Sequence, residues 1–122
     1  MPYAYRKSER LRKNTEFVST MKGKRLSVDG LSLFYAKNEA GNFRVGISIG
    51  RKLANAVKRN RLKRQVRDCI MRVLEGHAAG YDLVFVVRKE LSVAPYEKIL
   101  RTVETALQKS VLRIWKSEGT AP

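Results

Sequence analysis

The densest group of chemically active side chains in this sequence is a run of cations between residues 51 and 67. The run contains eight lysine or arginine residues and no acidic residue. Like charges four residues apart on a helix repel by roughly a few tenths of a kcal/mol per pair, and a phosphate backbone would offset that repulsion. Guanidinium groups also match the geometry of phosphates. The run therefore predicts a surface that binds a polyanion. The residues of this predicted surface are Arg51, Lys52, Lys58, Arg59, Asn60, Arg61, Lys63, Arg64 and Arg67.

The overall charge of the chain supports the same prediction. The 122 residues include 26 Lys and Arg against 11 Asp and Glu, which gives a net charge of +15. Residues 1–72 hold 19 basic and 5 acidic side chains, whereas residues 73–122 hold 7 and 6. A solvated helix face would intersperse both signs, and a nuclear-localisation signal would not explain the open strand face described below. The excess charge therefore indicates nucleic-acid binding.

Length and composition limit the architecture. A chain of 122 residues with 43% hydrophobic content has room for one domain, spanning 1–122, with a basic N-terminal arm at 1–13. The single cysteine, Cys69, excludes an intramolecular disulfide and fits a cytoplasmic protein. The sequence contains no apolar run long enough to cross a bilayer, so we expect no membrane partner.

The sequence contains no recognisable catalytic or metal-binding constellation. The one histidine, His77, lies in a predicted loop, and Cys69 lies on an apolar helix stripe, where a thiol is buried and inert. The carboxylates are scattered, and the Cys/His spacing typical of zinc sites is missing. We therefore expect no catalytic residue and no metal ligand in this chain. Any chemistry that it serves would belong to another molecule.

The hydrophobic pattern predicts the order α-β-β-α-β-α in a two-layer α/β (α+β) sandwich with a small mixed sheet. Asn14 can cap a first helix over 14–22, which Gly23 would close. An apolar stripe predicts the basic helix over 56–74, and a segment that is apolar on both faces predicts a central strand over 81–88. The other predicted elements are strands over 31–37 and 43–50, joined by a turn, and a long helix from Pro95 whose stripe reaches Ile114.

A second candidate surface is an open face of the predicted sheet. Alternate residues of strand 43–50 point away from its apolar side, and Phe34 joins this face if strand 31–37 pairs with it. Aromatic side chains beside positive charge suit unstacked, single-stranded nucleotides. The alternative is that the apolar members of the groove are core residues. The residues predicted to form this groove are Phe17, Met21, Phe34, Arg44, Gly46 and Ser48.

The most basic segment of the chain closely resembles the bacterial ribonuclease P protein subunit. The resemblance rests on the arginine-asparagine-arginine signature at Arg59, Asn60 and Arg61, within the longer match at 56–68. It extends to residues 11–17, which look like the first-helix entry of that family. Residues 43–49 and 81–88 look like two of its strands.

This resemblance implies that the chain is a protein cofactor of a catalytic RNA. Together, the protein and the RNA would remove the 5′ leader from precursor tRNA. The RNA subunit would require Mg²⁺ and perform the hydrolysis, so the protein itself would bind no cofactor. The signature helix would face the catalytic RNA, and the groove, joined by Arg12, would receive the leader. The implied partners are ribonuclease P RNA and precursor tRNA, without an obligate protein partner.

The resemblance also implies a left-handed β-α-β crossover in a ribosomal-protein-like sandwich, whereas general rules favour a right-handed crossover. Two other functions fit the charge. A ribosomal or other structural RNA-binding protein would share it but would not predict the signature. A double-stranded DNA-binding protein would place the basic helix in a major groove, but the sequence lacks a helix-turn-helix pair or a dimerisation signal.

Overall fold

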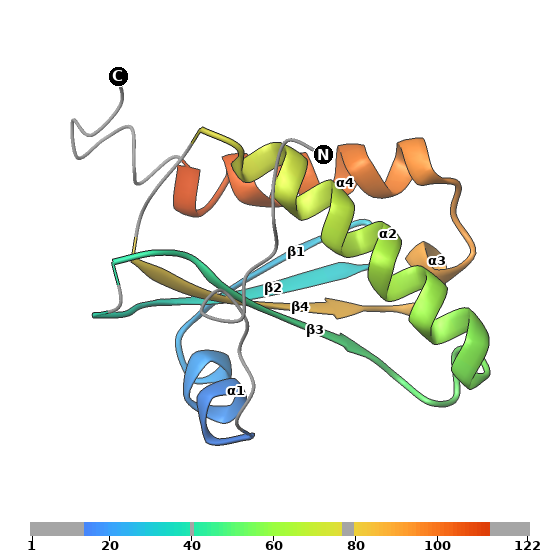
Figure 1. The fold of residues 1–122 in the computed structure, drawn as a ribbon, viewed down its shortest axis with the longest axis horizontal. Helices are drawn as coiled ribbons and strands as arrows, with labels where there is room; N and C mark the ends of the chain where they lie inside the picture. Colours follow the sequence, from blue (N-terminus) through green and yellow to red (C-terminus); the bar gives the residue numbers. More distant parts are fainter. Residues whose placement is uncertain (1–13, 40, 77–79, 113–122) are drawn as a thin grey trace.

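The computed structural model describes residues 14–39, 41–76 and 80–112. Their elements are α1 (Asn14–Met21), β1 (Lys24–Val28), β2 (Leu31–Lys37), β3 (Arg44–Ile49), α2 (Ala56–Leu74), β4 (Tyr81–Val87), α3 (Lys89–Ser92) and α4 (Tyr96–Gln108). The strands form one mixed sheet, with α2 and α4 over one face and α1 against the other (Figure 1). The predicted α/β class and mixed sheet are confirmed.

The sheet has the strand order β1-β2-β4-β3, in which β3 and β4 are parallel and the other pairs are antiparallel. The prediction of a central strand over 81–88 is confirmed, because Val84 and Phe85 point to opposite faces and both are fully buried. The pairing of strands 31–37 and 43–50, which was the condition for Phe34 to join the open face, does not occur, because β4 lies between them. A strand that is apolar on both faces buries more surface in the interior of a sheet than at its edge.

The predicted element order missed strand β1 and the short helix α3. β1 is an edge strand that pairs with β2 through the hairpin turn at Asp29 and Gly30. Both turn residues have positive φ, 39° and 84°, as the two central residues of a type I′ turn require. In β1 only Leu26 and Val28 pack partly against the core, so the strand carries a weak hydrophobic signal. Asp-Gly between alternating segments was the available sequence signal for this hairpin.

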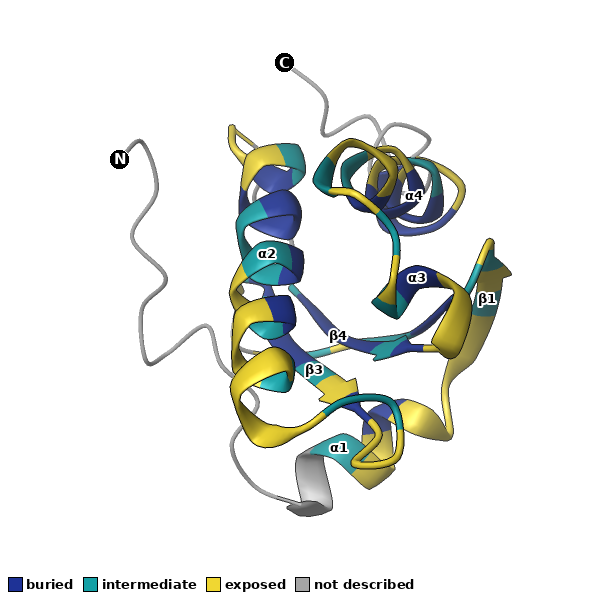
Figure 2. Ribbon diagram, turned by 90° about the vertical axis from the view of Figure 1, so that its right-hand side faces the viewer, coloured by how far each residue is buried: buried dark blue, intermediate teal, exposed yellow. Residues whose placement is uncertain are grey.

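The main core lies between the sheet and the helices α2 and α4. Leu33, Phe85 and Val45 from the sheet meet Val66 and Ile99 from the helices, and each is almost fully buried. Because α2 links the parallel strands β3 and β4, these three elements form a β-α-β unit. In Figures 1 and 2, which view the unit from two sides, the crossover through α2 is left-handed, as the resemblance implied.

Helix α2 has the bounds that the sequence predicted. The side chain of Asn55 caps its N-terminus by accepting a hydrogen bond from the backbone N–H of Lys58 at 2.9 Å. Leu62 and Ile70 are buried on the predicted stripe, and so is the thiol of Cys69. Burial raises the pKa of the Cys69 thiol from 9.0 to about 11, which is consistent with an inert thiol.

The ends of two other helices differ from the prediction. α1 ends at Met21, and Gly23 does not close it in a left-handed conformation. Instead, Gly23 allows close chain approach, because a Cβ atom there would lie 2.7 Å from the carbonyl oxygen of Tyr35. α4 ends at Gln108, so the predicted helix is interrupted before the buried Val111. His77, Arg12 and Ile114 lie outside the described residues.

Candidate nucleic-acid interface

Most cations of α2 lie outside the apolar stripe through which the helix packs on the protein. Arg61 and Arg64 are exposed, whereas Lys63 and Arg67 are half-buried. Figure 2 shows the exposed stripe of α2 facing away from α4. The stripe exists because Leu62, Val66 and the later apolar residues occupy the opposite side of the helix. The predicted cations therefore share one accessible surface. Its remaining members are the exposed Lys58 and Asn60, the half-buried Arg59, and the exposed Arg51 and Lys52 in the turn that follows β3.

Arg59 differs from its neighbours because it also has a local structural contact. Its Nη1 atom donates a hydrogen bond to the carbonyl oxygen of Ala54 at 3.0 Å. This contact ties the start of α2 to the turn that precedes it. Arg61 and Arg64 have no comparable hydrogen bond among those that the described residues form. The surface thus combines one arginine that fixes the loop with two whose guanidinium groups project into solvent.

The second predicted surface also comes together, although its strands are not neighbours. The pairing register places Phe34 of β2 opposite Val84 of β4, and Val84 opposite Gly46 of β3. Arg25 of β1 lies opposite Phe34 on the other side. Residues in such a row share one face of the sheet, which is the face that carries α1. Because β4 lies between β2 and β3, Phe34 and Gly46 still share one face of the sheet but are one strand further apart than predicted.

Helix α1 covers part of this face through Phe17. The Cζ and Cε1 atoms of its ring lie 2.5 and 2.7 Å from the position that a Cβ atom on Gly46 would occupy. The tip of the ring can come this close to the strand only because residue 46 is glycine. Phe17 is half-buried, whereas Val18 and Met21 remain 45% and 43% exposed. Where α1 packs on the sheet, it thus leaves apolar side chains partly accessible to solvent.

Arg44 is placed on the predicted face but is neutralised there. Its Nε and Nη2 atoms form two hydrogen bonds to the carboxylate of Asp82, at 2.8 and 2.7 Å. Asn38 donates a further hydrogen bond to the same carboxylate at 2.6 Å. Such a fork is the strong geometry for an arginine and a carboxylate. Arg44 therefore fixes the end of the sheet and brings little net positive charge to the groove.

The positive charge of this face comes instead from two arginines outside the predicted set, Arg25 and Arg88. The guanidinium carbon of Arg25 lies 5.6 Å from the centre of the Phe34 ring, within the range of a cation–π contact. Arg88 follows β4, and its Nε atom donates a hydrogen bond to Ser32 at 3.0 Å. Arg25 was missed because β1 was not predicted, and Arg88 because it ends a strand interpreted only as core.

The far end of the same face is polar. Ser48 is exposed and aligns with Val86, which in turn aligns with Ser32. The row therefore extends this face of the sheet beyond Phe34, past the buried Ser32, toward Arg88. Met21, Phe17, Phe34 and Ser48 are thus brought to one side of the sheet, and α2 lies on the other.

Within the described ranges, no group of three or more His, Cys, Asp or Glu side chains is placed to hold a metal ion. Among the same residues, no helix is long and apolar enough to span a bilayer.

These features define a class: a strongly basic α+β protein with a cationic helix on one face of its sheet and half-buried Phe17 and Phe34 on the other. The sequence pattern of the Ribonuclease P family matches residues 5–111, and the chain belongs to that family. Membership implies a role in tRNA processing within an RNA-based endoribonuclease, with ribonuclease P RNA as the partner.

Relatives and solved structures agree with this assignment. The chain is 33% identical over 116 residues to the ribonuclease P protein component of Bacillus cereus strain B4264, covering 93% of this chain and 94% of that relative. Its fold is similar to that of the RNase P protein of Thermotoga maritima, with a TM-score of 0.73, 33% identity, and coverage of 83% and 96%. The RNase P protein of Staphylococcus aureus gives a TM-score of 0.76 at 28% identity, with coverage of 84% and 94%.

Proposed function

We propose that this protein is the cofactor of a ribonuclease P in which the catalytic RNA hydrolyses the phosphodiester bond that joins the 5′ leader to tRNA. The protein binds the catalytic RNA through the cationic surface of α2 and binds the leader in the groove between α1 and the sheet. The observation that carries this proposal is the acid-free cluster of accessible cations on α2 in a member of the Ribonuclease P family. It acts in the cytoplasm, without an obligate protein partner.

The division of labour follows from the chemistry of the chain. The arginines of α2 can neutralise phosphates, which favours close approach of RNA. Mg²⁺ serves the RNA subunit, where it supplies the charge that stabilises the reacting phosphate. The protein contributes by holding the precursor and the folded catalytic RNA together. A double-stranded DNA-binding function is less well supported, because it gives no role to the aromatic groove on the opposite face of the sheet.

Reconstitution tests the assignment directly. The full chain is added to a bacterial ribonuclease P RNA at low Mg²⁺, and cleavage of precursor tRNA is followed. We expect strong stimulation by the wild-type chain, none from the protein without RNA, and weak stimulation by the double variant Arg61→Ala, Arg64→Ala. Lys109→Ala, an exposed cation at the end of α4, is the matched control and should behave as wild type. Failure of the wild-type chain to stimulate would favour a structural RNA-binding role.

The leader groove has its own test at Phe34. A base stacked on an aromatic ring contributes about 1–3 kcal/mol. Phe34→Ala should therefore weaken holoenzyme binding of precursor tRNA by about 5- to 150-fold and leave mature tRNA binding unchanged. Val93→Ala, at a side chain that is 83% exposed beside α3, is the control. Equal losses for precursor and mature tRNA would remove the groove from the proposal.

A further inference from the structure

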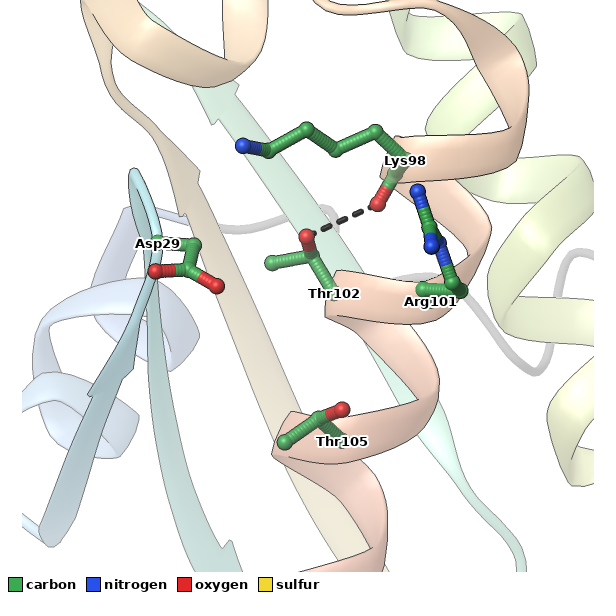
Figure 3. Close-up of a pocket in the computed structure, with 5 residues that line it drawn as sticks. All are labelled: Asp29, Lys98, Arg101, Thr102 and Thr105. Atoms are coloured by element: carbon green, nitrogen blue, oxygen red, sulfur yellow. Dashed lines mark hydrogen bonds between the residues drawn. The ribbon is translucent and has the colours of Figure 1, made fainter.

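A cavity of about 300 Å³ lies between the β1–β2 turn and helix α4, away from both surfaces described above. Figure 3 shows its lining residues, of which Asp29 comes from the turn and the others from α4. α4 packs over β1 and β2, whereas α2 packs over β3. Because β1 and β3 are the opposite edges of the sheet, the cavity is separated from the cationic surface of α2. The lining residues are Asp29, Lys98, Arg101, Thr102 and Thr105.

The four α4 residues reach the cavity because their spacing places them on one side of the helix. Lys98 and Arg101 are exposed, and Thr105 is half-buried. Thr102 is only 4% exposed, and its hydroxyl donates a hydrogen bond to the carbonyl oxygen of Lys98 at 2.8 Å. In Figure 3 the Lys98 side chain extends across the cavity toward the turn. The α4 side of the cavity thus carries Lys98 and Arg101, with Thr102 and Thr105 completing the lining.

The opposite wall is acidic and is fixed by the backbone. Asp29 occupies a left-handed position with φ 39° in the tight turn of the β1–β2 hairpin. The carboxylate of Glu90 lies nearby, 3.2 Å from the position that a Cβ atom on Gly30 would take. Among the ion pairs that the described residues form, none joins Asp29 to Lys98 or Arg101. Lys98 therefore faces Asp29 across the cavity without forming an ion pair with it, and Arg101 lies beside Lys98 on α4.

This arrangement selects the chemistry of a ligand. A simple anion site would not place a carboxylate opposite its cations, and a cation site would not include lysine and arginine. A ligand that carries both an anionic group and a neutral hydrogen-bond donor satisfies both walls. The ribose-phosphate unit of RNA has these two groups, because its 2′-hydroxyl can donate to a carboxylate while its phosphate binds cations.

We propose that this cavity binds a ribose-phosphate unit of single-stranded RNA, with Lys98 and Arg101 on the phosphate and Asp29 accepting a hydrogen bond from the 2′-hydroxyl. The inference depends on the proposed function only for its ligand class, RNA. It gives the protein a contact on the β1 edge that distinguishes RNA from DNA, in addition to the surfaces on α2 and beneath α1.

The test uses the full ¹⁵N-labelled chain without the catalytic RNA, titrated with the ribodinucleotide UpU, with its 2′-deoxy counterpart dUpdU, and with inorganic phosphate. We expect UpU to shift the backbone amide signals of Asp29, Gly30 and Lys98 to Thr102. It should bind there about 3- to 10-fold more tightly than dUpdU, as one hydrogen bond allows. Equal binding of the two dinucleotides, or phosphate binding as tight as that of UpU, would overturn the proposal by showing an unselective anion site.

Variants separate the two walls. Asp29→Gly keeps a residue that tolerates positive φ, so the turn is retained while the carboxylate is lost. It should bring UpU binding down to the level of dUpdU, whereas Arg101→Ala should weaken both, and the control Lys109→Ala neither. Melting curves verify that each variant is folded. If Asp29→Gly is folded and preserves the preference for UpU, the proposed role of Asp29 is refuted. Because this assay contains no catalytic RNA, its failure is distinguishable from failure to stimulate ribonuclease P.

Discussion

Replacing Gly46 with alanine should destabilise the protein through its contact with α1. The added Cβ would lie 2.5 Å from Cζ of Phe17, whereas carbon atoms in favourable contact are separated by about 3.5–4.0 Å. The ring must therefore move away from β3, and α1 must move with it. Inserting a methyl group into a packed contact typically costs about 1–3 kcal/mol, and we expect a loss within that range.

A double-mutant cycle measures this contact by urea denaturation. Phe17→Ala alone removes a half-buried ring, and in the double variant the methyl group added at position 46 has room. The double variant should therefore lose about 1–2 kcal/mol less unfolding free energy than the sum of the losses of the two single variants. Gly50→Ala is the matched control, because a Cβ at that position meets only Cγ of Leu53, at 3.8 Å.

Two results would refute this reasoning about Gly46. The first is additivity of the two substitutions within about 0.5 kcal/mol, which is the behaviour of residues that do not touch. The second is a Gly46→Ala variant as stable as Gly50→Ala. In the reconstituted holoenzyme, Gly46→Ala should also weaken binding of precursor tRNA more than mature tRNA, because the displaced ring forms a wall of the groove.

Three further predictions concern other contacts. Arg59→Ala should lower the unfolding free energy by about 1 kcal/mol through its lost hydrogen bond to Ala54, whereas Arg61→Ala should not, as denaturation curves will show. Asp82→Asn should cost about 1–3 kcal/mol, because it leaves the half-buried guanidinium of its partner without a carboxylate; a variant as stable as wild type would contradict this. Because the pKa of Cys69 is raised from 9.0 to about 11 in the fold, its contribution to stability is fully present below pH 9 and is lost as the pH rises to about 11. Across that window the unfolding free energy of the wild type should fall by up to about 2–3 kcal/mol relative to Cys69→Val, as denaturation at a series of pH values will show.

The sequence by itself determined the features that depend on local periodicity and charge. The apolar stripe defined α2, and the doubly apolar segment defined β4 as a central strand. The same stripe predicted that Cys69 is buried. The excess of cations on the other side of α2 identified the candidate interface. These inferences succeed because the faces of a helix or strand follow from residue spacing, without reference to the rest of the chain.

The tertiary structure alone decided which distant segments meet. It placed β4 between β2 and β3, added β1 at the edge, and neutralised Arg44 through Asp82, which is 38 residues away. It also set the ring of Phe17 against the backbone of Gly46. Strand periodicity specifies which side chains share a face but not which strand lies alongside, because pairing partners are selected by the total surface buried in the assembled sheet. The charge of the groove therefore could not be read from Arg44 alone, since an ion pair between distant residues exists only in the folded chain.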